Sequence, residues 1–148
     1  MTRWQEFVDD DPVLAARVRD RFSVRKHCTL ATIRADGSPR ISGTEVEFAE
    51  GELRIGSMPG AVKAKDLLRD PRLSLHSPTV DPPDDEPAAW DGEAKVAGRA
   101  IAVASPDESH RFVIDVSEVV LTHLDDAGTQ LVITSWHPGR GTREVRRA

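Results

Sequence analysis

Residues 27–76 constrain the fold more than any other stretch, because short extended runs alternate there with turn signals. The extended runs are residues 28–33, 40–48 and 52–57. The turns between them contain Asp36-Gly37 and Glu50-Gly51. Asp-Gly and Glu-Gly pairs between β-compatible runs indicate two hairpins in succession. This stretch therefore predicts three consecutive antiparallel strands.

A short helix is predicted next in the chain. Residues 61–69 are good helix formers, and the pair Asp70-Pro71 ends the run. Alternation returns at residues 72–76, which indicates a further strand. The loop 57–60 enters the helix, and free N–H groups at a helix N-terminus beside a serine and two lysines suit a phosphate. The alternative is a Gly/Pro turn followed by a solvent-exposed amphipathic helix.

Three sequence frames in this stretch resemble one known superfamily. The frames are TLATIRADGSPRIS at 29–42, GELRIGS at 51–57 and KAKDLLRDPRLSL at 63–75. Together they resemble the split barrel of the pyridoxamine-phosphate-oxidase-like superfamily, which includes FMN enzymes and enzymes that use the deazaflavin F420. The segment SWHPGRG at 135–141 also resembles the endings of small members. The resemblance implies a homodimer with two cofactor sites at the subunit interface.

The resemblance also implies where a cofactor phosphate binds. Lys63 matches the lysine of the family's Lys-Ala pair, whereas Val62 stands where pyridoxamine-phosphate oxidases have arginine. Ser42 falls near the position of another phosphate-binding arginine, and Arg40 on the same strand face is the alternative cation, so both residues are predicted to bind the cofactor. The loop before the helix adds Ser57 and Met58 as predicted cofactor-binding residues.

Three further residues are predicted to bind the cofactor, each with a structural alternative. Lys65 reaches an extended anionic tail or faces solvent. Trp136 stacks on a flavin ring from the partner subunit or is a core or interface aromatic. Arg140 holds the anionic tail or is a surface charge. No catalytic side chain is assigned, since the cofactor carries the hydride chemistry.

The rest of the chain completes one predicted domain, residues 1–148. Residues 1–26 form a helical lead-in with Leu14, Val18 and Phe22 as one apolar stripe. Residues 77–91 form an acidic, proline-rich loop, for which a lid, a dimer contact and disorder are the alternatives. Trp90 in this loop is a lid aromatic or an anchor. The capping box 105–108 predicts a helix to about Ile114. The predicted strands in this part of the chain are 92–104, 116–124 and 131–136, and a tail follows at 137–148.

These elements predict a mainly β, α+β fold, a six- to seven-stranded antiparallel split β-barrel with short flanking helices. The net charge of −5 argues against a nucleic-acid partner, and no apolar run reaches membrane length. Cys28 is the single cysteine, which excludes an intramolecular disulfide, fits a reducing cytoplasm and favours a structural role. No metal-ligand spacing is present, so no metal site is expected.

Two functions follow from the sequence. The first is an oxidoreductase that uses FMN or F420 and acts on a small conjugated or heterocyclic molecule. Val62 in place of arginine and the arginine-rich composition favour F420 slightly. The second is a non-catalytic carrier of the same fold that binds a flavin, F420 or haem.

Overall fold

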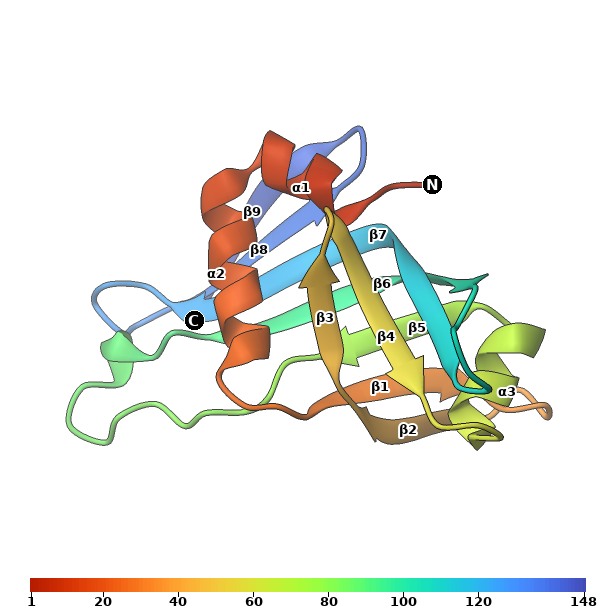
Figure 1. Ribbon diagram of the computed structural model, residues 1–148. Helices are drawn as coiled ribbons and strands as arrows, with labels where there is room; N and C mark the ends of the chain where they lie inside the picture. The colour runs from red at the N-terminus through yellow and green to blue at the C-terminus, as the bar shows by residue number, and fades with distance from the viewer.

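The structure, a computed structural model, describes residues 1–148 and is built on nine antiparallel strands with three short α-helices (Figure 1). The helices are α1 (Trp4–Asp10), α2 (Pro12–Ser23) and α3 (Val62–Arg69). The strands are β1 (Cys28–Ile33), β2 (Pro39–Thr44), β3 (Val46–Ala49), β4 (Glu52–Ser57), β5 (Arg72–His76), β6 (Glu93–Val103), β7 (His110–Leu124), β8 (Leu131–His137) and β9 (Gly141–Arg147). This architecture confirms the predicted mainly β fold. None of the helices has the length and hydrophobicity needed to span a membrane.

The strand order explains why the sheet curls into a barrel. The strands pair in the order β2-β1-β5-β6-β7-β4-β3, and every pairing is antiparallel. The two ends of this order, β2 and β3, are consecutive in the chain and are joined only by Glu45. The connection therefore brings both sheet ends together, although no ladder of hydrogen bonds closes them, and the barrel remains split.

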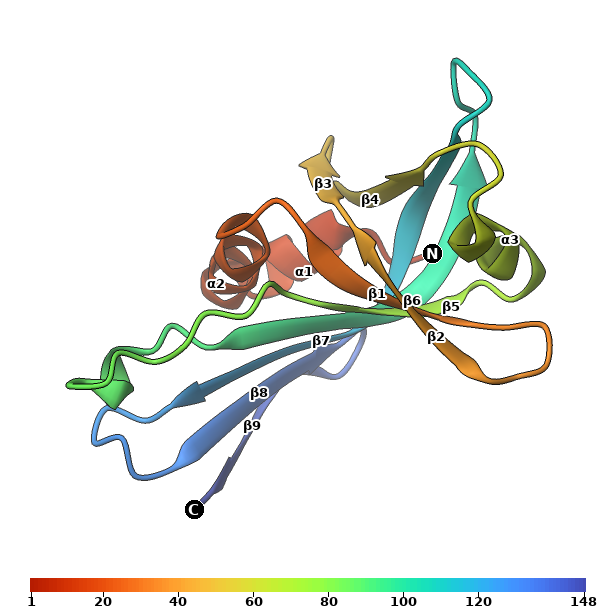
Figure 2. The same cartoon turned by 90° about the horizontal axis from the view of Figure 1, so that it is seen from below.

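Strand β7 divides the sheet into a barrel and an arm. Residues 110–113 pair with β4, whereas residues 119–124 of the same strand pair with β8. The pairing of β6 with β7 shifts register between Ala97 and Gly98, whose partners Glu118 and Val116 leave Ser117 of β7 unpaired. A Cβ on Gly98 would lie 2.1 Å from the carbonyl oxygen of Asp115, so only glycine permits this close approach. Figure 2 shows β8 and β9 projecting away from β3 and β4.

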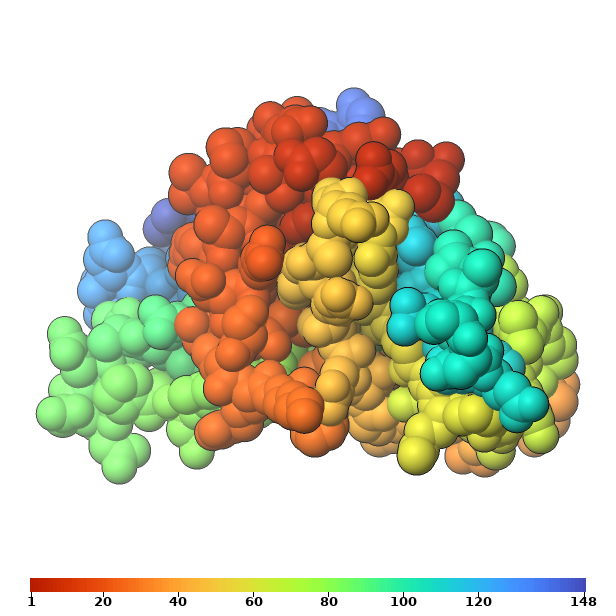
Figure 3. Space-filling view, viewed as in Figure 1, coloured from red at the N-terminus to blue at the C-terminus, as the bar shows by residue number.

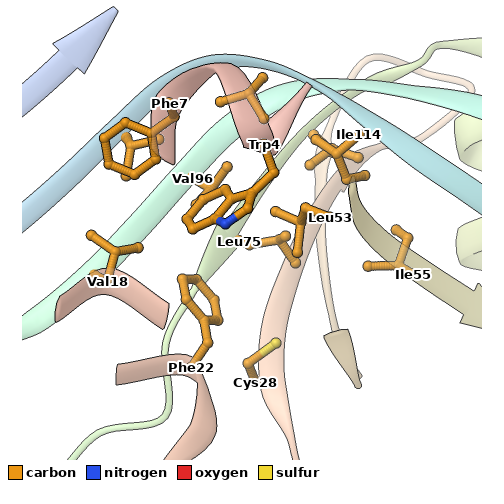
Figure 4. Packing of buried hydrophobic residues seen from close by; sticks show 14 of the residues in the cluster. Trp4, Phe7, Val18, Phe22, Cys28, Leu53, Ile55, Leu75, Val96 and Ile114 are labelled. Carbon is orange, nitrogen blue, oxygen red and sulfur yellow. The ribbon is translucent and has the colours of Figure 1, made fainter. Parts of the chain in front are cut away.

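Helices α1 and α2 cover the barrel with the predicted apolar stripe. Asp11 caps α2, because its carboxylate accepts a hydrogen bond from the Leu14 N–H at 3.1 Å. Val18 and Phe22 are buried below this cap. Trp4 of α1 packs edge-on against Phe48 of β3, with 4.8 Å between ring centroids, and Figure 4 shows it within the core. These contacts fix the helical lead-in on the sheet.

The predicted helix at 105–114 is wrong. Asp107 accepts hydrogen bonds from the N–H and hydroxyl of Ser109 and from the Ser105 hydroxyl, which makes a tight turn instead of a helical cap. Strand β7 then begins at His110, which pairs with Ser57. The capping pattern is a local signal for a helix. Residues 112–114 are apolar and become buried when they pair with distant strands. This tertiary pairing makes the segment a strand instead of a helix.

Two other sequence boundaries also differ from the structure. The extended run 40–48 is two strands that break at Glu45, because the chain passes there from one end of the sheet to the other. The predicted tail contains β9, which pairs with β8 along its whole length. These two differences raise the strand count from the predicted six or seven to nine. In the acidic loop, the Trp90 indole N–H donates to the Val80 carbonyl at 2.8 Å, the contact expected of an anchor.

Candidate cofactor-binding site

A cavity of about 990 Å³ lies where the barrel meets the N-terminus of α3. Its walls come from the end of β2, from β3 and β4, and from the β6–β7 turn region. Figure 3 shows this face of the molecule, with β3 and β4 in yellow beside the cyan segment that joins β6 to β7. The predicted residues that line it are Ser57, Met58 and Lys63. The structure therefore brings together the loop and the lysine that the sequence frames singled out.

The start of α3 presents several donors at this cavity. The N-cap residue Ala61 makes no side-chain hydrogen bond, and the first turn contains no acidic residue. The N–H groups of Ala64 and Lys65 donate to the Ala61 carbonyl, whereas those of Val62 and Lys63 have no backbone partner. The Lys63 ammonium donates to the Gly43 carbonyl at 2.8 Å and forms no ion pair. Free N–H groups and a lysine at a helix N-terminus favour an anion.

Two buried hydroxyl groups in the cavity wall lack a hydrogen-bond partner. They belong to Thr44, at the end of β2, and to Ser57, at the end of β4. Thr44 is only 4% exposed, so its unpartnered hydroxyl costs about 1–3 kcal/mol by the usual desolvation penalty. Such groups are uncommon in folded proteins and call for an explanation. A bound ligand with acceptor oxygens would accept hydrogen bonds from both hydroxyls. The same ligand would also accept from the Lys63 ammonium in the cavity wall.

Arg40 is engaged away from this cavity. Its Nε atom lies 2.7 Å from Oδ2 of Asp66, a residue of α3 that is 2% exposed. Asp66 also accepts hydrogen bonds from the Thr32 hydroxyl at 2.7 Å and from Arg69 at 3.1 Å. Burial raises the pKa of the Asp66 carboxyl, but the bonds from Arg40, Thr32 and Arg69 outweigh burial and hold this pKa below its ordinary value. Asp66 thus attaches α3 to β1 and β2 as a carboxylate.

The remaining predicted residues also lie outside the cavity wall. Lys65 is exposed and Ser42 is half-buried, and neither lines the cavity. Trp136 is 2% exposed, and its indole N–H donates to Asp10 at 2.6 Å. Arg140 donates to the carbonyl and hydroxyl oxygens of Ser135, both at 2.9 Å. Trp136 and Arg140 line a separate hollow of about 350 Å³ beside α1. Cofactor binding by these residues, and by Arg40, stays a prediction.

Sequence reasoning missed three residues in the cavity wall. Thr44 shares a strand face with Arg40 and Ser42, but nothing in the sequence shows that its hydroxyl is left unpartnered. Arg54 alternates with the buried residues of β4 and forms ion pairs with Glu50 and Glu52, both at 2.8 Å. Arg111 falls within the helix that was wrongly predicted. Its place at the cavity depends on the pairing of β7 with β4, for which the local sequence holds no signal.

Cys28 lies in the core near this site, as the predicted structural role requires. It is 6% exposed, and Figure 4 shows its sulfur directed into the core. Burial raises the pKa of the Cys28 thiol to about 11, so the reactive thiolate is scarce at neutral pH.

The sequence model of pyridoxamine 5'-phosphate oxidase matches residues 14–133. The chain belongs to this family. Its match covers most of α2, the whole barrel and the first residues of β8, so the cavity lies inside the family region. No curated protein sequence matches the chain.

Solved structures of family-like proteins share the fold at low sequence identity. An FMN-binding, pyridoxamine 5'-phosphate oxidase-related protein from Nostoc punctiforme superposes with a TM-score of 0.66 at 11% identity, covering 93% of this chain and 96% of its own. The heme storage protein HutZ from Vibrio cholerae superposes with a TM-score of 0.55 at 14% identity, covering 73% of this chain and 92% of its own. An F420 reductase reaches a TM-score of 0.50 at 14% identity, covering 67% and 92%. At these identities the similarity establishes the fold alone.

Proposed function

We propose that the chain is an oxidoreductase that binds FMN or F420 in the 990 Å³ cavity and acts on a small conjugated or heterocyclic molecule. The observation that carries this proposal is the pair of unpartnered buried hydroxyls, Thr44 and Ser57, beside the free N–H groups at the start of α3. Two structural neighbours, an FMN-binding protein and an F420 reductase, support the choice of cofactor class.

The chain's own residues bind and orient the cofactor in this proposal. Lys63 and the free N–H groups at the start of α3 hold the phosphate, and Thr44 and Ser57 donate to oxygens of the ligand. The bound cofactor supplies the hydride chemistry, while the protein contributes position and electrostatics. Met58, which is 80% exposed at the cavity mouth, covers the ligand with an adaptable apolar side chain.

The proposal includes a homodimer with the cavity at the subunit interface. Four large apolar side chains are exposed around the cavity and the neighbouring ends of α3 and β6, namely Met58, Val62, Ile101 and Val103. An apolar group of this kind beside a ligand site favours burial against a partner. A second subunit covering this face would exclude water from the cofactor.

A carrier is the second candidate function. The observation that favours it is the shared fold with the heme storage protein HutZ and with an FMN-binding protein. A carrier would bind its ligand in the same cavity without turnover. Haem lacks a phosphate, so a haem carrier would not depend on Lys63 as a phosphate ligand.

Equilibrium titration tests the proposal directly. The purified protein is titrated under identical conditions with FMN, F420, riboflavin and haem, and its visible spectrum is recorded before any addition. The proposal expects FMN or F420 to bind more tightly than riboflavin, which has no phosphate. Turnover of the reduced cofactor with a panel of heterocyclic acceptors then separates the enzyme from the carrier. Binding of haem alone would reject the flavin or deazaflavin assignment.

A further inference from the structure

The hollow of about 350 Å³ beside α1 carries charges of both signs. It forms where α1 meets the turn that joins β8 to β9, and Figure 1 shows these two segments side by side. Its wall shares no residue with the wall of the cofactor cavity. The wall residues with polar side-chain atoms are Glu6, Asp10, Trp136 and Arg140. Its volume lies at the small end of the range for small-molecule sites.

Arg140 is fixed in this wall but is not neutralised. Its Nη2 atom donates to the carbonyl and hydroxyl oxygens of Ser135, both at 2.9 Å. Its Nε atom donates to the Gly141 carbonyl at 3.3 Å, whereas its Nη1 atom donates to no atom of the chain. No carboxylate lies within ion-pair distance of the guanidinium. Because all three acceptors are neutral, they orient the guanidinium and leave its charge and one donor edge for an anionic group.

Asp10 is fixed on the α1 side of the hollow. Its Oδ2 atom accepts the hydrogen bond from the Trp136 indole N–H at 2.6 Å, and Trp136 itself is buried. Asp10 forms no ion pair. Glu6 lies one helical turn earlier on α1, and its carboxylate has neither a hydrogen-bond partner nor an ion pair. The α1 side of the hollow is therefore anionic, whereas the turn side carries the cation of Arg140.

Opposite charges that line one hollow attract each other and would form an ion pair if both were free to move. Here the bonds to Ser135 and Gly141 hold Arg140, and the bond from Trp136 holds Asp10, beyond ion-pair distance. A ligand with a carboxylate and an ammonium group bridges this gap, because each of its ends meets the opposite charge. The two wall carboxylates outnumber the single guanidinium, so a ligand with a second ammonium group matches the wall best.

We propose that this hollow binds a free basic α-amino acid. The ligand's carboxylate lies on Arg140, and its two ammonium groups lie on Asp10 and Glu6. Trp136 is a positioning residue, since it contacts the ligand site through the carboxylate that it fixes. The two walls share no residue, so this inference does not depend on the cofactor or reaction of the larger cavity.

Calorimetric titration of the full chain with L-lysine, cadaverine and L-norleucine tests the inference. Cadaverine lacks the carboxylate of lysine, and norleucine lacks its side-chain ammonium. The parent protein should bind L-lysine saturably, more tightly than norleucine and about tenfold more tightly than cadaverine, as one charge-assisted contact predicts. Arg140→Gln should remove this preference by weakening lysine binding about tenfold while cadaverine binding changes less than about twofold.

Two further variants test the anionic side of the hollow. Asp10→Asn keeps an acceptor for Trp136 but removes the charge, so it should weaken the binding of both lysine and cadaverine. Glu6→Gln should do the same without touching the bond to Trp136, which keeps the test decisive if Asp10→Asn fails to fold. The matched control, Arg143→Gln, removes an exposed arginine from β9 outside the hollow and should behave as the parent protein.

Three results would overturn the inference and leave the proposed function intact. They are no saturable binding of L-lysine at millimolar concentration, equal affinities for lysine and cadaverine, and parent-like lysine binding by Arg140→Gln. Weaker binding of FMN or F420 by folded Arg140→Gln would also overturn it, because the arginine would then belong to the cofactor site. Thermal unfolding of each variant confirms that the titrated protein is folded.

Discussion

Replacing Asp66 by asparagine should destabilise the protein by removing one buried negative charge while keeping the side-chain shape. Asp66 is 2% exposed and receives hydrogen bonds from Thr32, Arg40 and Arg69. The amide that replaces the carboxylate still accepts one or two of these bonds but no longer neutralises either arginine. The substitution therefore tests whether this carboxylate attaches α3 to the barrel.

The structure sets the size of the expected effect. Removing one partner of a fully buried ion pair costs about 3–5 kcal/mol. The side chains of Arg40 and Arg69 are 23% and 41% exposed, so water solvates part of the charge that is left behind. We therefore expect a loss of about 2–3 kcal/mol in the free energy of unfolding, below the cost for a fully buried pair. For a chain of this length that loss lowers Tm by roughly 5–10 °C.

The assay is thermal and urea unfolding of the parent protein and Asp66→Asn between about pH 3 and pH 7, a range that spans the ordinary titration of a carboxyl group. The folded-state pKa of Asp66 is lowered, so its stabilisation is fully present above its unfolded pKa of about 3.9. That stabilisation is lost as the pH falls through the lower folded-state pKa. The gap between the two proteins should therefore be widest near neutral pH and should narrow in acid.

A matched control is Asp70→Asn, which removes the carboxylate that pairs with Arg72 at the surface 2.7 Å away. This exposed pair should contribute less than the buried one. Equal Tm values for Asp66→Asn and the parent at neutral pH would refute the reasoning. A stability gap that stays constant from neutral pH into acid would also refute it, because the loss would then not depend on charge.

Three further predictions follow from the core and the surface. Cys28→Ala should cost about 1 kcal/mol of stability and leave turnover unchanged, and abolished turnover in a folded, cofactor-loaded variant would overturn the structural role. Trp136→Phe removes the hydrogen bond to Asp10 and should cost about 2 kcal/mol in urea unfolding. Its cofactor affinity should match that of the parent, whereas a tenfold loss would favour ring stacking. Light scattering at micromolar concentration with cofactor present should give twice the chain mass of 16.3 kDa, and a monomer alone would reject the dimer.

The elements that the sequence predicted well are those fixed by local patterns. The turn at Asp36-Gly37 joins β1 to β2, and Glu50-Gly51 joins β3 to β4, where Glu50 adopts a φ of 54°. The helix predicted at 61–69 matches α3 within one residue, because Asp70-Pro71 ends it locally. In these segments, neighbouring residues carry enough information to define both the element and its end.

The errors concern contacts between distant residues. The capping box at 105–108 has the residue pattern of a helix start, but pairing of β7 with β4 and β6 makes the following residues a strand. Distant contacts also bear on calls that stay predictions: Arg40, proposed from the sequence as a phosphate ligand, contacts Asp66, which lies 26 residues away. The unpartnered state of Thr44 and the pairing state of Arg111 likewise depend on which strands surround them. Only the three-dimensional structure contains that information.

Cofactor titration of Lys63→Ala against Lys65→Ala tests the central claim most directly. Lys63 lines the cavity and donates to Gly43, whereas Lys65 is exposed two residues further along the same helix. Lys63→Ala should weaken FMN or F420 binding by about ten- to hundredfold, because a charge-assisted phosphate contact contributes about 1.5–3 kcal/mol. Lys65→Ala should cost less, and Tm without cofactor should barely change in either variant. If Lys63→Ala binds both cofactors as tightly as the parent at low salt, where a charge contact is least screened, the proposed phosphate site is contradicted.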